Sequence, residues 1–199
     1  MITERPPRAR ARREAFARSD ALDRIDLPAD DRLRRPARKI ERALAAEDRA
    51  AVEEACREFL RAAAAFYGVP APAVRVLAAR PRRVYRDGGA TELFGDYDLE
   101  TGLIRVWMRT AVRKRVTSFG TFLSTLCHEF CHHLDRHGLG FPETPHTRGF
   151  YARTARLYHH ARGTPYRELH WIALPGGAFR VDWARLRGRG RFDGREGGP

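Results

Sequence analysis

The apolar residues of this chain recur at helical spacing in some segments and alternate with polar residues in others. The clearest helical pattern follows Asp48, which can cap a helix N-terminus, and continues to about Tyr67, where Gly68 and Pro70 stop it. A shorter helix is predicted over residues 36–45. The apolar face of the longer helix consists of Val52, Ala55, Phe59, Leu60, Ala63 and Phe66.

Alternating patterns predict strands elsewhere. Residues 74–77 are typical of a strand, and residues 91–97 and 103–109 flank a glycine-containing turn, as in a hairpin. A second small hairpin is predicted from residues 168–173 and 178–183. In the first hairpin, the side chains expected to face the core are Ile104, Val106 and Met108. Together these elements predict an α+β fold in which a small antiparallel or mixed sheet packs on helices.

A further amphipathic helix carries the most informative motif of the chain. Thr117 or Ser118 can cap its start, and Gly138 and Gly140 end it. The pentapeptide at 128–132, His-Glu-Phe-Cys-His, lies within it. The apolar residues, which lie mostly on the side opposite the histidines, are Phe119, Phe122, Leu123, Leu126, Phe130 and Leu134.

His128 and His132 are four residues apart, so they lie about 40° apart around the helix and point from one face. Two histidines at this spacing bind zinc, and the adjacent Glu129 is then the general base of a metal-dependent hydrolase. A purely structural zinc site has no need of this glutamate. The motif therefore predicts His128 and His132 as metal ligands and Glu129 as the catalytic residue.

A catalytic zinc ion requires a third protein ligand and one open position. A metzincin would place this ligand at position 138, which is glycine, and a gluzincin would use a glutamate, which residues 148–163 lack. His146 remains, just before a predicted helix that runs through Tyr151. Its competitors are His137, His159, His160 and His170, and the angle of His133 directs that side chain elsewhere.

Three other residues of the metal helix have two interpretations each. Asp135 lies nearly under His128 and could support a ligand histidine from behind, or it could be an ordinary solvated carboxylate. Cys127 and Cys131 could be metal ligands of a closed site, but their angle from the histidines favours small core residues.

Three segments of the chain resemble the SprT-like zinc metalloprotease family. Gly95-Asp96-Tyr97-Asp98 with Thr101-Gly102-Leu103-Ile104 is similar to its glycine-and-tyrosine hairpin, and Cys127–His133 to its metal helix. His146-Thr147-Arg148-Gly149-Phe150 is similar to its third-ligand motif. The resemblance covers roughly residues 85–160 and implies a minimal zincin-like fold, zinc bound by His128, His132 and His146, and Glu129 as the base.

The predicted function is a zinc-dependent peptidase that acts on protein or peptide, with DNA-associated proteins as one substrate class. A sheet edge beside the metal would bind an extended peptide by strand addition. Tyr97, Tyr151 and His133 are candidates for stabilising the oxyanion. One alternative is a nucleic-acid-associated module with a structural or inactive zinc site. Another is a metal-dependent hydrolase that acts on something smaller than protein, which a closed pocket would favour. The cysteine-rich ribbon found after the catalytic part of many family members is absent, since the three cysteines are Cys56, Cys127 and Cys131.

The composition of the chain predicts flexible tails, possible contact with DNA and the cellular compartment. The net charge is +13, and residues 1–40 and 184–199 carry excess arginine, which suggests non-specific DNA contact through basic tails. Residues 1–36 are Arg- and Pro-rich and are predicted to be disordered, residues 37–183 to form the metalloprotease domain, and residues 184–199 to be a flexible Gly/Arg tail. The odd number of cysteines suggests reduced thiols, and no signal peptide or apolar span is visible, so we expect a cytoplasmic protein that does not enter membranes. The oligomeric state is not predicted.

Overall fold

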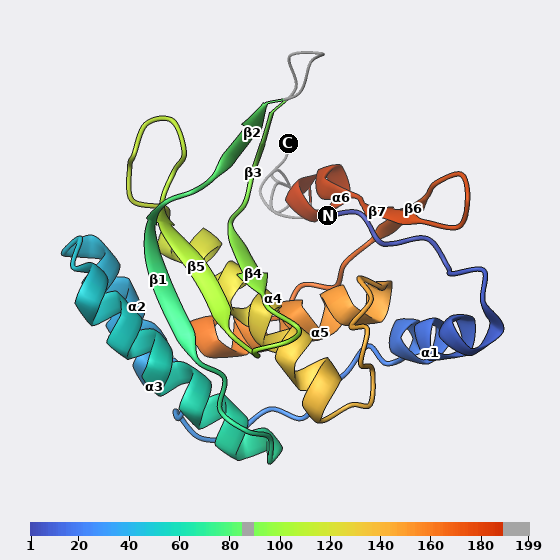
Figure 1. Cartoon of the computed structure of the whole chain (residues 1–199), viewed down its shortest axis with the longest axis horizontal. Coiled ribbons are helices and arrows are strands. Elements are labelled where there is room, and N and C mark those ends of the chain that lie inside the picture. The colour runs from blue at the N-terminus through green and yellow to red at the C-terminus, as the bar shows by residue number, and fades with distance from the viewer. Residues whose placement is uncertain (85–89, 189–199) are drawn as a thin grey trace, which may run out of the picture.

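In the computed structural model, which describes residues 1–84 and 90–188, a three-stranded sheet supports the helices (Figure 1). The strand order is β1 (Val74–Ala79), β5 (Ile104–Arg109) and β4 (Gly95–Tyr97). β1 and β5 are parallel, with Val74 opposite Ile104, and β4 and β5 are antiparallel, with Tyr97 opposite Ile104. The sheet is therefore mixed, and β4 lies at its edge.

Four helices pack around one core. α3 (Arg49–Tyr67) contacts β1, and α4 (Phe119–His137) contacts β4, β5 and α3. α2 (Arg34–Ala45) packs on α3, and α5 (Arg148–Arg162) packs on α4. The predicted core residues of β5, Ile104, Val106 and Met108, are buried in the same cluster as the apolar faces of α3 and α4. The α+β prediction is confirmed, with the helices α3 and α4 on one face of a mixed sheet.

Local sequence signals determine where the main helices begin and end. The Asp48 side chain accepts a hydrogen bond from the Ala51 amide at 3.0 Å, and Gly68 ends α3 in the left-handed conformation with φ 66°. At the start of α4, the Ser118 side chain accepts from the Thr121 amide at 3.3 Å. Both caps satisfy amides that the first turn of a helix leaves without partners.

The strands agree with the sequence pattern less closely. The predicted strand 91–97 divides into β3 (Ala90–Glu92) and β4, because β3 pairs with β2 (Arg82–Val84) instead of β5. β2 and β3 form an arm that projects from the sheet (Figure 1). The second predicted hairpin is confirmed as β6 (Trp171–Ala173) and β7 (Phe179–Val181).

Residues 1–36 are not the disordered tail that their composition predicts. They contain α1 (Arg10–Ala21), which packs on α5, and the Asp20 carboxylate accepts hydrogen bonds from the backbone and side chain of Arg148. A Cβ atom at Gly149 would overlap backbone oxygens at the end of α1, so the helix approaches α5 as closely as glycine allows. The disorder prediction fails here because contacts with distant segments, invisible in local composition, hold the residues: polar contacts to α5, and the burial of Leu33 in the core.

At the other end, α6 (Trp183–Gly188) begins the predicted C-terminal tail, and residues 189–199 lie outside the described residues. Within the described residues, no helix combines the length and apolar character needed to cross a bilayer.

Candidate metal centre

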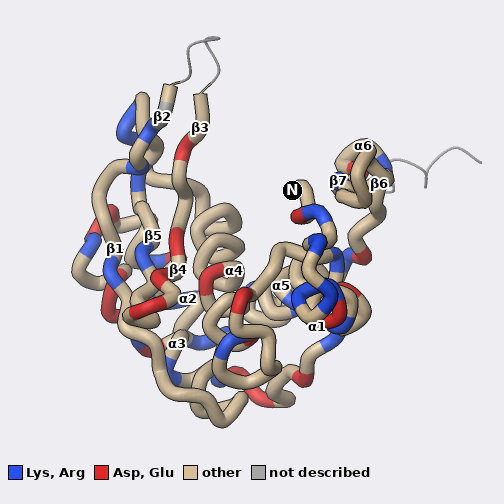
Figure 2. The backbone as a smooth tube through the Cα atoms, turned by 45° about the vertical axis from the view of Figure 1, so that its right-hand side comes forward, with Lys and Arg blue, Asp and Glu red and all other residues tan. Residues whose placement is uncertain are grey.

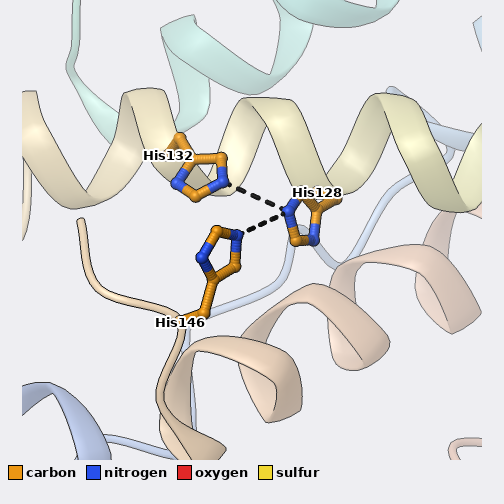
Figure 3. Close-up of side chains that lie close together, drawn as sticks. All are labelled: His128, His132 and His146. Carbon is orange, nitrogen blue, oxygen red and sulfur yellow. Dashed lines mark hydrogen bonds between the residues drawn. The ribbon is translucent and has the colours of Figure 1, made fainter. Parts of the chain in front are cut away.

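Two of the predicted ligands come from one face of α4. His128 and His132 are one turn apart, and the apolar residues of the helix that face the core, including Leu126 and Phe130, are fully buried. This packing holds the helix in one rotation about its axis, so both imidazoles project toward the segment that follows the helix (Figure 3).

The third predicted ligand, His146, lies immediately before α5. Thr147 caps this helix by accepting a hydrogen bond from the Phe150 amide at 3.0 Å. The connection from α4 turns back through Gly140, at φ 73°, and Thr144, at φ 40°. A β-branched residue rarely adopts a positive φ, so the backbone is strained beside the centre.

The three imidazoles converge through their Nε2 atoms (Figure 3). His128 Nε2 lies 3.0 Å from His146 Nε2 and 3.1 Å from His132 Nε2. Tetrahedral zinc with Zn–N bonds near 2.0–2.1 Å would separate two nitrogens by about 3.3 Å. Among the described residues, these three histidines form the group with ligand atoms close enough, within 4.8 Å of one another, to hold a metal ion.

Protonation of the rings provides a test of whether a cation fits. A proton on His128 Nε2 could be shared properly with only one of its two neighbouring nitrogens, whereas a cation accepts lone pairs from all three. Burial lowers the pKa of His128 to about 3 and that of His132 to about 2. Neutral imidazole is the form that binds metal, so the residues present fit a divalent ion at neutral pH.

Two further side chains contact the outer nitrogens of the ligand rings. Thr144 Oγ1 lies 2.5 Å from Nδ1 of His132, and Glu4 Oε1 lies 2.9 Å from Nδ1 of His146. Hydrogen bonds at this position orient metal-bound histidines and select the tautomer whose other nitrogen is free. Neither residue could be predicted from the sequence, since Thr144 follows no motif and Glu4 lies in the segment expected to be disordered.

Glu129 lines the same cavity of about 430 Å³ as the three histidines. Its side chain is buried, and burial, with a smaller effect of the Asp96 charge, raises its pKa to about 8. A Cβ atom at Gly95 of β4 would lie 2.8 Å from Glu129 Oε1. The glycine thus provides the space in which the carboxylate faces the cavity.

The remaining candidates of α4 have other partners. His133, as predicted, points away: its Nε2 donates to the Pro70 carbonyl at 2.7 Å, and its Nδ1 accepts from the Tyr97 hydroxyl at 3.1 Å. Cys127 and Cys131 are buried core residues, and burial raises the pKa of both thiols. Asp135 has neither predicted role, because it is fully buried and paired with Arg153.

Of the three residues considered for the oxyanion, the structure leaves Tyr97 in the cavity. Tyr151 packs beside His146, with ring centroids 5.8 Å apart, but its hydroxyl donates to the Ile2 carbonyl at 3.0 Å. Tyr97 lines the cavity from β4, and its hydroxyl is donated to His133. The arrangement can thus hold a metal with the Glu129 carboxyl beside it, and the Tyr97 hydroxyl would have to leave His133 to reach an oxyanion.

In comparisons with known proteins, no family model, no curated protein and no solved structure matches this chain. The function of this chain must therefore be inferred from the geometry of the site and from the motifs of the chain itself.

Proposed function

We propose that this protein is a zinc-dependent peptidase whose metal ligands are His128, His132 and His146. The observation that carries the proposal is the convergence of three imidazole nitrogens in a cavity that also contains the buried side chain of Glu129. Three protein ligands leave a fourth position open, which distinguishes catalytic from structural zinc sites. The similarity of the motifs to SprT-like metalloproteases favours the same assignment.

The chemistry divides between the metal and the chain. When bound, zinc supplies a Lewis acid that polarises a carbonyl and acidifies water. Glu129 takes the proton from the attacking water and passes it to the leaving amine. Burial raises the pKa of Glu129 to about 8 without metal, and a bound divalent cation would favour the ionised carboxylate, which is the form that accepts the proton.

The edge of the sheet favours a peptide over a small substrate. β4 is an edge strand, and its residues Gly95, Asp96 and Tyr97 line the cavity of the metal centre. The apolar side chains of Leu93 and Leu99, each 42% exposed, lie on the wall of the same cavity. An extended peptide can add to such an edge through backbone hydrogen bonds and place its side chains against apolar residues.

A nucleic-acid-associated role has weaker support. Basic residues in the first forty positions lie near acidic ones (Figure 2), and several are paired, as Arg12 is with Glu143 at 2.9 Å and Arg32 with Asp30 at 2.7 Å. Such pairing reduces the charge available to phosphate. Contact with DNA stays a prediction from the net charge.

The decisive experiment compares the wild type with Glu129→Gln. Purified protein is assayed for bound zinc and for cleavage of casein and of itself, with and without single-stranded DNA. We expect about one zinc per chain in both proteins and cleavage by the wild type alone. Zinc in both proteins without cleavage by either would instead favour a structural site.

A further inference from the structure

The first residues of the chain extend the C-terminal hairpin. The Thr3 amide donates to the Phe179 carbonyl at 2.8 Å, and the Val181 amide donates to the Met1 carbonyl at 3.1 Å. The Thr3 hydroxyl also accepts from the Phe179 amide at 2.8 Å. Residues 1–3 therefore lie along β7 as an additional extended segment.

This segment delivers Glu4 to the third histidine, 142 positions away in sequence. The Glu4 amide donates to the His146 carbonyl at 2.9 Å. In return, Glu4 Oε1 accepts from the His146 amide at 3.2 Å and from the ring Nδ1 at 2.9 Å. Three contacts between two residues fix both the backbone and the ring of His146.

We propose that Glu4 is a positioning residue, which holds His146 as the Nδ1–H tautomer with Nε2 directed at His128 and His132. The inference rests on the proposed metal centre, since these are its ligands. A carboxylate can only accept from Nδ1, so this contact leaves the lone pair on Nε2, the atom that lies 3.0 Å from His128. The N-terminal segment is then part of the metal centre and not a tail.

An ordinary surface ion pair is the competing explanation. The side chains of Glu4 and His146 are 54% and 32% exposed, and pairs this accessible contribute little to stability. Removing the Glu4 carboxylate should accordingly leave the fold intact. The two explanations differ in what they predict for the His146 ring. Positioning by Glu4 fixes its orientation and tautomer, whereas an ordinary surface pair does not require either.

Glu143 provides a matched control. It lines the same cavity as Glu4, is similarly exposed at 58%, and pairs with Arg12 and not with a ligand histidine. Glu4→Gln and Glu143→Gln therefore remove the same charge from the same cavity, and only the first alters a contact to His146.

The first test measures the tautomer of His146 in the full-length, metal-free protein by long-range ¹⁵N–¹H NMR above the pKa of ordinary histidine, with His146→Asn to assign the signals. The Nδ1–H form is expected in the wild type and in Glu143→Gln, and a shift toward the Nε2–H form in Glu4→Ala. Glu4→Gln, whose amide oxygen still accepts, should lie between them. An unchanged tautomer in Glu4→Ala would overturn the inference.

The second test measures zinc affinity by chelator competition, with thermal unfolding as the check on folding. Loss of a carboxylate behind a ligand histidine weakens metal binding by about 10- to 100-fold, and we expect this for Glu4→Ala but not for Glu143→Gln. Equal losses in Glu4→Gln and Glu143→Gln would assign the effect to charge and overturn the inference. If the wild type binds no zinc but Glu4→Ala still shifts the tautomer of His146, the metal centre is refuted and the positioning of His146 by Glu4 stands.

Discussion

Arg153 of α5 and Asp135 of α4 form an ion pair in which both side chains are completely buried. Nη2 of Arg153 lies 2.8 Å from Oδ1 and 2.9 Å from Oδ2 of Asp135. Nη1 of the same guanidinium donates to the carbonyl of Ser19 at 3.0 Å and also to that of Leu22. One side chain therefore joins the metal helix, the helix after the third ligand and the N-terminal helix.

Breaking this pair should cost far more stability than replacing it. Arg153→Met leaves a buried, unpaired carboxylate, and we expect it to lower the free energy of unfolding by about 3–5 kcal/mol. The double variant Arg153→Met, Asp135→Leu removes both charges and should recover much of that loss. Urea denaturation in the presence of a chelator measures all three proteins. Arg156→Met, on the same helix, is the surface control, and strictly additive losses would contradict the prediction.

Gly95 should be required for the position of Glu129. In Gly95→Ala, the new methyl would lie 2.8 Å from Glu129 Oε1 and 2.5 Å from Thr125 Cγ2, so strand β4 or the carboxylate must move. We expect at least a tenfold loss of peptidase activity, since a displacement of about 1 Å can cost a hundredfold, with zinc still bound.

A second substitution distinguishes the clash of the new methyl with Thr125 from its clash with Glu129. Adding Thr125→Ser to Gly95→Ala removes the clash with Cγ2 but leaves the one with Glu129. Thermal stability should improve in the double variant while activity stays low. Recovery of activity together with stability would show that the clash with Glu129 is unimportant.

Thr144 should contribute to metal affinity through its hydroxyl. Thr144→Val keeps the shape of the side chain but removes the oxygen that lies 2.5 Å from Nδ1 of His132, so zinc should dissociate more readily, by about 10-fold or more. Thr144→Ser retains the oxygen and should bind zinc like the wild type. Chelator competition measures both, and equal affinities for the two variants would exclude a role for the hydroxyl.

The raised pKa of Glu129 predicts how the metal-free protein responds to pH. The unfolded chain loses this proton near 4.5, whereas the folded protein keeps it to about 8. Between these values the native state binds more protons, so its stability falls as pH rises, by up to about 1.4 kcal/mol per pH unit from this group. The free energy of unfolding of the wild type, relative to that of Glu129→Gln, should therefore fall between pH 4.5 and about 8 and stay constant at higher pH.

This difference is measured by denaturation of both proteins with chelator at several pH values. A bound divalent cation stabilises the ionised carboxylate and so lowers the pKa of Glu129 in the folded protein. With zinc present, the loss of stability should therefore end at a lower pH. A difference between wild type and Glu129→Gln that does not change with pH would mean that Glu129 is accessible to water in the folded protein.

Patterns that depend on neighbours within a few residues could be predicted from the sequence. The helix that carries His128 and His132 follows from its apolar spacing and its Ser118 cap, and one helical turn is enough to bring two imidazoles together. The histidine before Thr147 could be selected by excluding other ligand types and by the resemblance of its motif, and the structure brings it to the other two.

The contacts that complete the centre could not be predicted, because they join residues far apart in the chain. Residues 1–36 lack an apolar pattern of their own, and their order comes from hydrogen bonds to α5 and β7 and from scattered apolar side chains, such as Leu33, that join the core. β3 is not part of the predicted hairpin because it pairs with β2. Local sequence by itself determined the two-histidine helix, its caps and the acid beside the ligands. The tertiary structure alone decided that Glu4 contacts the ring of His146, that Thr144 contacts the ring of His132 and that Asp135 pairs with Arg153. Such pairings depend on which distant segments the packed core brings within hydrogen-bond distance.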